Sequence, residues 1–149
     1  REGFAHALDV SSYSLVAVAK CAREKQMLKE NASIVALTYY GSEKSILGYN
    51  VMGVAKAALE SSIRYLARDL GKDLVRVNAI SAGPIKTLSA KGIKDFNSIL
   101  DIVEEKAPLH KNVTTKEVGD AVSFLFSDMA SAITGEVIHV DNGFSTVAV

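Results

Sequence analysis

Apolar residues along the chain alternate between helical spacing and short continuous runs. From Phe4 to about Met27 they cover a surface too broad for a helix that faces solvent, so we expect a largely buried helix there. Ser33–Tyr39 is a short apolar run rich in β-branched residues, which is typical of a strand buried on both faces. Val75–Ile80 and Glu136–Asp141 have a similar pattern and predict two more strands.

Three further helices are predicted between and after these strands. Apolar positions recur at three- and four-residue spacing over Tyr49–Leu70, and Gly71 is expected to cap this helix. Two shorter helices are expected at about 97–106 and 115–127, with an irregular or partly helical stretch over residues 85–97.

The order of these elements indicates the fold class. Strands that alternate with helices predict an α/β layer with parallel pairing, and we expect a doubly wound sheet. Three strands make a thin sheet, and the first helix has no strand before it. We therefore expect residues 1–149 to be a single partial domain, the C-terminal portion of a larger one.

Composition limits the classes of function. The chain has 149 residues, with 17 basic and 17 acidic side chains. A balanced charge argues against nucleic-acid binding, and no apolar run is long enough to span a membrane. The single cysteine, Cys21, leaves no internal disulfide and fits a reducing compartment. The three histidines lack ligand spacing, so we expect no metal site.

Tyr49 and Lys56 form a candidate reactive pair at the head of the long helix. Seven residues make two helical turns, so both side chains lie on one face, about 10 Å apart along the axis. We expect the lysine to lower the pKa of the phenol and to donate hydrogen bonds to a ribose diol. Tyr39, at the end of the first strand, is a third candidate. These residues would suit reduction of a substrate by a nicotinamide cofactor, although such spacing also occurs without a function.

Gly53 stands inside the same helix, where glycine costs about 1 kcal/mol relative to alanine. A close approach of another group to the helix would explain it, and so would a simple packing constraint.

Four segments together resemble a known family: Leu37–Tyr39, Tyr49–Lys56, Arg76–Thr87 and Gly135–Asp141. They are similar to the NADH-dependent enoyl-acyl-carrier-protein reductases, which belong to the short-chain dehydrogenase/reductase superfamily and have a Rossmann-type fold. Six residues separate Tyr49 from Lys56 here, whereas most members of the superfamily have three. The longer gap favours an enoyl reductase over the alternative, a ketoreductase or alcohol dehydrogenase.

The resemblance implies a reaction and roles for the candidate residues. The family reduces the double bond of a trans-2-enoyl thioester on acyl carrier protein in type II fatty acid synthesis. Tyr49 would polarise the thioester oxygen, Lys56 would hold the nicotinamide ribose, and Tyr39 would line the acyl site and donate a proton. All three are thus candidate catalytic residues, and ligands of open α/β sheets do bind outside the carboxyl ends of the strands.

The resemblance also implies residues that contact cofactor and substrate. The segment after the second strand would run along the nicotinamide and pyrophosphate of NADH; it comprises Gly83, Pro84, Ile85, Lys86, Thr87, Leu88 and Ser89. Three apolar residues would form the acyl pocket beside the two tyrosines, with residues 88–96 as a mobile lid; they are Met52, Ile93 and Phe96.

One departure from the family pattern is the absence of its glycine-rich loop, which cradles the cofactor diphosphate. We therefore expect this chain alone to bind NADH weakly or not at all. It also leaves open a third interpretation, a truncated non-catalytic relative kept for assembly. By resemblance we expect a homotetramer with an interface near Val137–Val149, and a cytoplasmic location in a bacterium, with the plastid as the alternative.

Overall fold

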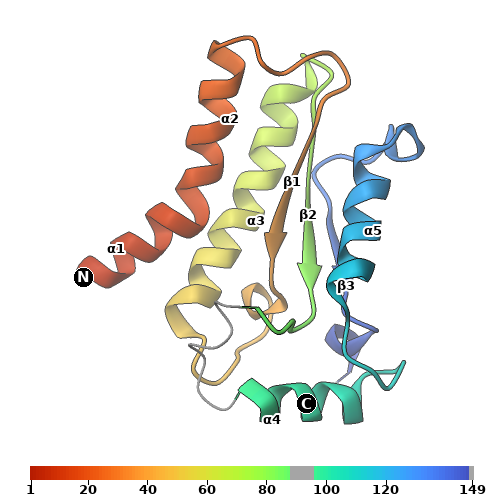
Figure 1. The fold of residues 1–149 in the computed structure, drawn as a ribbon. Coiled ribbons are helices and arrows are strands. Elements are labelled where there is room, and N and C mark those ends of the chain that lie inside the picture. The colour runs from red at the N-terminus through yellow and green to blue at the C-terminus, as the bar shows by residue number, and fades with distance from the viewer. Residues whose placement is uncertain (88–95, 148–149) are drawn as a thin grey trace.

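A parallel sheet of three strands forms the centre of the computed structural model, which describes residues 1–87 and 96–147 (Figure 1). The strands are β1 (Ser33–Thr38), β2 (Arg76–Ala82) and β3 (Val137–Val140), in the order β1-β2-β3. Both pairs are parallel, as predicted. The central strand β2 is almost wholly buried, because it has a neighbouring strand on each side.

Helices cover both faces of this sheet. Helix α3 (Asn50–Gly71) lies on one face and α5 (Thr115–Phe126) on the other, while α4 (Phe96–Lys106) lies near the ends of the strand arrows (Figure 1). Successive side chains of β2 point to opposite faces of the sheet, so Ala79 packs in the cluster beneath α3 and Ile80 in the cluster beneath α5. The predicted alternation of strands and helices is confirmed.

The end of α3 differs slightly from the prediction. Gly71 is the last residue of the helix, and Lys72 takes the cap position in a right-handed conformation. Leu74 instead has the positive φ, 56°, that turns the chain back toward β2. The expectation that Gly71 caps the helix is therefore wrong by one position.

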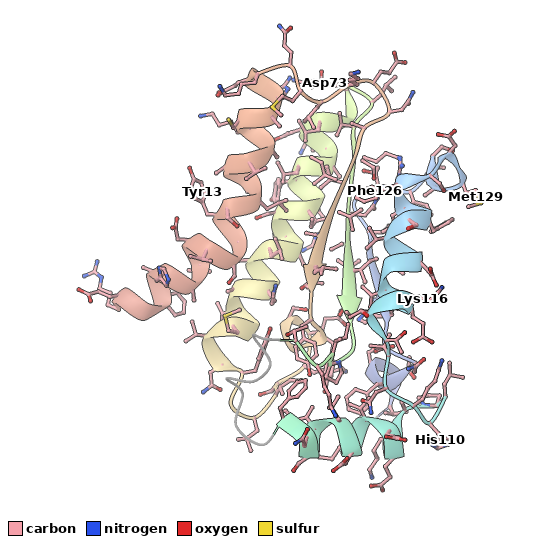
Figure 2. The ribbon with its side chains drawn as sticks, in the orientation of Figure 1. Tyr13, Asp73, His110, Lys116, Phe126 and Met129 are labelled. Carbon is pink, nitrogen blue, oxygen red and sulfur yellow. The ribbon has the colours of Figure 1, made fainter. Side chains whose placement is uncertain are left out.

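The N-terminal arm is helical but not largely buried, so that prediction is wrong. It consists of α1 (Glu2–Leu8), a π-helical turn over Asp9–Tyr13, and α2 (Ser14–Glu24). The arm packs along α3, which can cover only one side of it. Val18 is 67% exposed and Tyr13 is 59% exposed, and Tyr13 projects from the side away from α3 (Figure 2).

Strand β1 is also less buried than predicted. It pairs only with β2 within the described residues, so it forms an edge of the sheet. Leu37 is 54% exposed, whereas Thr38 at the carboxyl end is buried. The described residues leave one edge of β1 unpaired and cover its faces only in part, so the strand is mostly half-buried.

The N-terminus of α5 is fixed by a capping box. The Thr114 hydroxyl accepts a hydrogen bond from the Glu117 backbone N–H, and the Glu117 carboxylate accepts one from the Thr114 N–H at 2.8 Å. Glu117 also accepts a hydrogen bond from Lys111. The Lys111 bond, followed by the bonds from Thr114, lowers the pKa of Glu117 from 4.5 to about 2.

No helix within residues 1–87 and 96–147 has the length and apolar character needed to cross a membrane.

The depressed pKa of Glu117 predicts a pH-dependent contribution to stability. Its carboxylate stabilises the fold above pH 4.5, and this contribution fades as the pH falls through the folded pKa of about 2. Glu117→Gln should therefore be less stable than wild type at neutral pH in urea unfolding, with the difference narrowing in acid. The control is Glu30→Gln, at an exposed position, which should leave the free energy of unfolding unchanged at every pH tested. A difference that stays constant down to the acid limit would contradict the prediction.

Candidate active site

The carboxyl end of β1 and the head of α3 bring two tyrosines together. Tyr39 follows β1, and Tyr49 immediately precedes the first turn of α3. Their ring centroids lie 5.0 Å apart at an interplanar angle of 72°, an edge-to-face contact. Tyr40 also packs edge-on against Tyr39, with ring centroids 5.0 Å apart, and contacts Phe144. An aromatic cluster therefore fixes the orientation of the candidate phenols.

Two glycines permit this approach. A Cβ at Gly53 would lie 2.7 Å from the carbonyl oxygen of Gly41, and a Cβ at Gly41 would lie 2.6 Å from the Tyr49 ring. Both distances are shorter than real Cβ contacts, so each position needs a hydrogen in place of a side chain. The close approach considered for Gly53 is thus present, and it seats α3 against the corner after β1.

Lys56 lies two turns into α3 and reaches back to the same strand end. Its Nζ donates a hydrogen bond to the Leu37 carbonyl oxygen at 2.9 Å. Burial lowers the pKa of Lys56, and the nearby carboxylate of Glu60 partly opposes that shift. An ammonium has three donors, so two remain for a ligand.

The expectation that Lys56 lowers the pKa of Tyr49 is wrong in this structure. Burial raises the pKa of Tyr49, and burial together with the neighbouring phenols of Tyr40 and Tyr49 raises the pKa of Tyr39. The ammonium is committed to a backbone carbonyl, so desolvation of the phenols prevails. Both phenols are therefore protonated hydrogen-bond donors at neutral pH. Within the described ranges, neither hydroxyl has a hydrogen-bond partner in the protein, which leaves both able to bind a ligand oxygen.

The segment after β2 begins in a confined place. The Gly83 N–H donates to the Val140 carbonyl at 3.0 Å, which extends the pairing of β2 and β3. A Cβ at Gly83 would lie 3.1 Å from Val113 Cγ1 and 3.3 Å from Asp141 Cα, so the backbone passes where a side chain fits poorly. Pro84 is buried beside it.

Beyond Pro84 the predicted cofactor segment turns outward. Ile85 is half-buried, and Lys86 and Thr87 are exposed. The remaining predicted contacts, Leu88, Ser89 and Ile93, lie outside the described residues. Their roles stay predictions.

The predicted acyl-pocket residues in the described part are half-buried. Met52 lies on α3 one turn from Tyr49, where its sulfur accepts a hydrogen bond from the Ser11 hydroxyl at 3.9 Å. This contact is with the N-terminal arm rather than with a pocket. Phe96 is the first residue of α4. A role for either side chain in binding an acyl chain remains a prediction.

Glu60 belongs to the site and was not predicted from the sequence. It is 7% exposed on α3, and one of its oxygens accepts hydrogen bonds from the Thr38 and Ser42 hydroxyls, both at 2.6 Å. The available signal was its spacing, because a residue four after Lys56 shares its helix face.

A polar cleft of about 520 Å³ opens beside Glu60, away from the tyrosine pair. It is lined by Ser42, Glu43, Ala57, Glu60, Arg64, Gly135, Glu136 and Val137. Neither tyrosine lines it, so its size does not make it the reactive site. No group of three or more potential metal ligands gathers anywhere in the described part of the chain.

These residues fit the nicotinamide end of a dinucleotide. Lys56 has donors for ribose hydroxyls, and Gly83 lets the backbone after β2 pack closely against Val113 and Asp141 at the same end of the sheet. The site also lies outside the carboxyl ends of two parallel strands, where open α/β sheets bind their ligands.

Comparison with known proteins decides the family. The family model described as Enoyl-(Acyl carrier protein) reductase matches residues 1–145. The chain belongs to this family. The Bacillus subtilis enoyl-[acyl-carrier-protein] reductase [NADH] is 61% identical over 148 residues, and the Staphylococcus aureus (strain MRSA252) enoyl-[acyl-carrier-protein] reductase [NADPH] is 58% identical over 147. In each case the match covers 99% of this chain and 57% of the relative.

A solved enoyl reductase confirms the fold. The Bacillus cereus enoyl-acyl carrier protein reductase, in complex with NADP+ and indole naphthyridinone, superposes with a TM-score of 0.94 at 56% identity. The match covers 100% of this chain and 57% of that structure. The chain therefore spans a little over half the length of these family members, and its Rossmann-type α/β class is confirmed.

The close contact between Gly53 and the Gly41 carbonyl predicts that Gly→Ala has opposite effects on stability at two helical positions, Gly53 and Gly119. Gly→Ala normally stabilises a helix interior by about 1 kcal/mol. Gly119→Ala in α5 should show this gain, since nothing lies within 4 Å of the added methyl. Gly53→Ala should instead destabilise, because its methyl would strike the Gly41 carbonyl. Urea unfolding of both variants checks this, and equal gains at the two positions would show that the contact is not tight.

Proposed function

We propose that this chain is the C-terminal part of an NADH-dependent enoyl-acyl-carrier-protein reductase of type II fatty acid synthesis. The observation that carries the proposal is the edge-to-face pair of Tyr39 and Tyr49 beside Lys56, at the carboxyl end of a parallel sheet. The substrate would be a trans-2-enoyl thioester on acyl carrier protein. Family membership and the protonated state of both phenols support this reaction.

Tyr49 would bind the thioester oxygen. Negative charge develops on that oxygen when the β-carbon is reduced, and a fixed O–H donor in a half-buried site stabilises such charge. Bound NADH would supply the hydride for the β-carbon. Because burial raises the pKa of Tyr49, its hydroxyl keeps the proton that this hydrogen bond requires.

Lys56 would hold the nicotinamide ribose with the donors that its bond to Leu37 leaves over. Its charge would add positive potential near the developing oxyanion. Tyr39 would line the acyl site and donate a proton, supported by its unpartnered hydroxyl in the described part of the structure.

The remaining assignments follow from the family resemblance. The strand-exit segment Gly83–Ser89 would run along the nicotinamide and pyrophosphate, and Met52, Ile93 and Phe96 would contact the acyl chain. The position of this segment at the carboxyl end of the parallel strand β2 supports the first assignment. We also propose that the protein is a homotetramer. The exposed apolar side chains of the N-terminal arm, Val10, Tyr13 and Val18, are suited to burial in such an assembly.

Family membership does not determine the nicotinamide cofactor. The Bacillus subtilis relative is named for NADH and the Staphylococcus aureus relative for NADPH, at 61% and 58% identity to this chain. We propose NADH, and rates measured with both cofactors at equal concentration decide between them.

Substitution of the reactive pair tests the proposed reaction. In the whole protein, Tyr49→Phe should lower kcat for a trans-2-enoyl thioester by about 100- to 1,000-fold, the usual effect of removing one oxyanion donor. Lys56→Met should chiefly raise KM for NADH, since it removes the ribose contact. The measurement is NADH oxidation under steady-state conditions. A protein that ignores enoyl thioesters and reduces ketones instead would contradict the proposed reaction.

The directions of the pKa shifts predict which group limits activity at high pH. Burial lowers the pKa of Lys56 and raises that of Tyr49, so it brings the loss of the lysine's proton closer to neutral pH and moves that of the phenol further from it. The alkaline fall of kcat/KM, which reports the free enzyme, should therefore belong to Lys56. Lys56→Arg should move this fall to higher pH in whatever activity remains, because a guanidinium stays charged. Tyr39→Phe is the control and should leave the position of the fall unchanged. An alkaline fall at the same pH in Lys56→Arg would contradict the assignment.

A further inference from the structure

Glu60 is unusually buried for a glutamate and accepts two side-chain hydrogen bonds. It is 7% exposed, and glutamates are almost never this buried unless their charge is paired or hydrogen-bonded. One carboxylate oxygen, Oε1, accepts both the Thr38 and the Ser42 hydroxyl at 2.6 Å. This length is typical of a hydroxyl that donates to an ionised oxygen. A single oxygen on α3 thus binds two residues of another segment.

The two donors stand on either side of Tyr39. Thr38 is the last residue of β1, and Ser42 is the last residue of the short 3₁₀ turn Tyr40–Ser42. Glu60 therefore binds the chain both before and after Tyr39, at the corner from which the Tyr39 ring projects. The other hydrogen bonds of the turn are backbone bonds to the carbonyls of Tyr39 and Tyr40, so Glu60 supplies its side-chain hydrogen bonds to α3, beside the aromatic packing and the close contact of Gly41.

Glu60 acts beside Lys56, one helical turn earlier on the same face of α3. Lys56 holds the Leu37 carbonyl at 2.9 Å, so the two side chains together fix three residues of the strand end. Any shift of the corner along α3 would change the distance between Tyr39 and the Tyr49–Lys56 pair.

The pairing of Thr38 with Glu60 is selective. Ser81 lies next to Thr38 in the register of β1 and β2, and its buried hydroxyl has no hydrogen-bond partner in the described structure. A bond between these two hydroxyls would satisfy both without any charge. The Thr38 hydroxyl is instead directed to the carboxylate on the helix, which ties strand to helix rather than strand to strand.

We propose that Glu60 is a positioning residue of the reductase, which sets the place of Tyr39 relative to Tyr49 and Lys56 by holding Thr38 and Ser42. This inference rests on the proposed function. It assigns Glu60 no contact with substrate or cofactor.

The test compares three variants of the whole protein with one control. Glu60→Gln keeps the shape and removes the charge, while Thr38→Val and Ser42→Ala each remove one donor and leave Glu60 in place. The control, Ser62→Ala, lies on the same helix and removes a hydroxyl that bonds only the Ala58 carbonyl of its own turn. The first readout is kcat for the enoyl thioester against KM for NADH, and the second is amide hydrogen exchange.

We expect kcat to fall by about tenfold to 100-fold in Glu60→Gln, the effect of a misplacement of about 1 Å, with KM for NADH little changed. Thr38→Val and Ser42→Ala should fall in the same direction. The amides of Ser42, Glu43 and Lys44, which bond the carbonyls of Tyr39 and Tyr40, should exchange faster in Glu60→Gln. Ser62→Ala should change neither readout.

Three other outcomes would contradict either this inference or the proposed function. Faster exchange with unchanged kcat in all three variants would show that Glu60 only supports the fold, and would overturn the inference. Unchanged exchange and unchanged kcat would overturn it as well. A wild-type protein that does not reduce enoyl thioesters would overturn the proposed function and this inference with it. If Glu60→Gln does not fold, the two donor variants decide.

Discussion

The contact between the backbone of α3 and the corner after β1 is the constraint on which the site depends. Gly53 lets the carbonyl of Gly41 approach the helix, and Gly41 leaves room for the ring of Tyr49. Side chains at these positions would push the helix head away from the strand end, and the edge-to-face contact of Tyr39 and Tyr49 would be lost. Packed interiors tolerate such a displacement poorly, because they have little free volume to absorb it.

Once the helix head is seated, its polar side chains complete the site in a medium of low polarity. Lys56 and Glu60 bind backbone and hydroxyl groups of the strand end, and neither is left unpaired. Burial then has opposite effects on the two kinds of reactive group, since it disfavours the charged form of each. It keeps the phenols protonated and makes the ammonium easier to deprotonate. In the proposed reaction, Tyr49 as donor to an oxyanion and Lys56 as cation for a ribose would work side by side only while the lysine remains charged.

The elements that the sequence predicted best are those governed by local periodicity. Helix α3 and the three parallel strands follow from spacing and from β-branched runs, because their packing repeats along the chain. The burial of the N-terminal arm and of β1 was overestimated, since apolar composition shows what a surface prefers and not what covers it. Two features of the site depend on tertiary contacts and were not predictable in the same way. The pKa of Tyr49 depends on which oxygen Lys56 reaches, and the role of Glu60 depends on two hydroxyls about twenty residues earlier in the chain.

We infer that the close contact of α3 with the corner at Gly41 places Tyr39 and Tyr49 relative to each other. The most direct measurement is kcat for a trans-2-enoyl thioester in the whole protein with Gly41→Ala, whose methyl would strike the Tyr49 ring. Gly3→Ala, with nothing within 4 Å of its methyl, is the matched control. We expect kcat to fall by about tenfold or more in Gly41→Ala, while circular dichroism shows a folded protein and the control keeps full activity. A folded Gly41→Ala protein with wild-type kcat would contradict it.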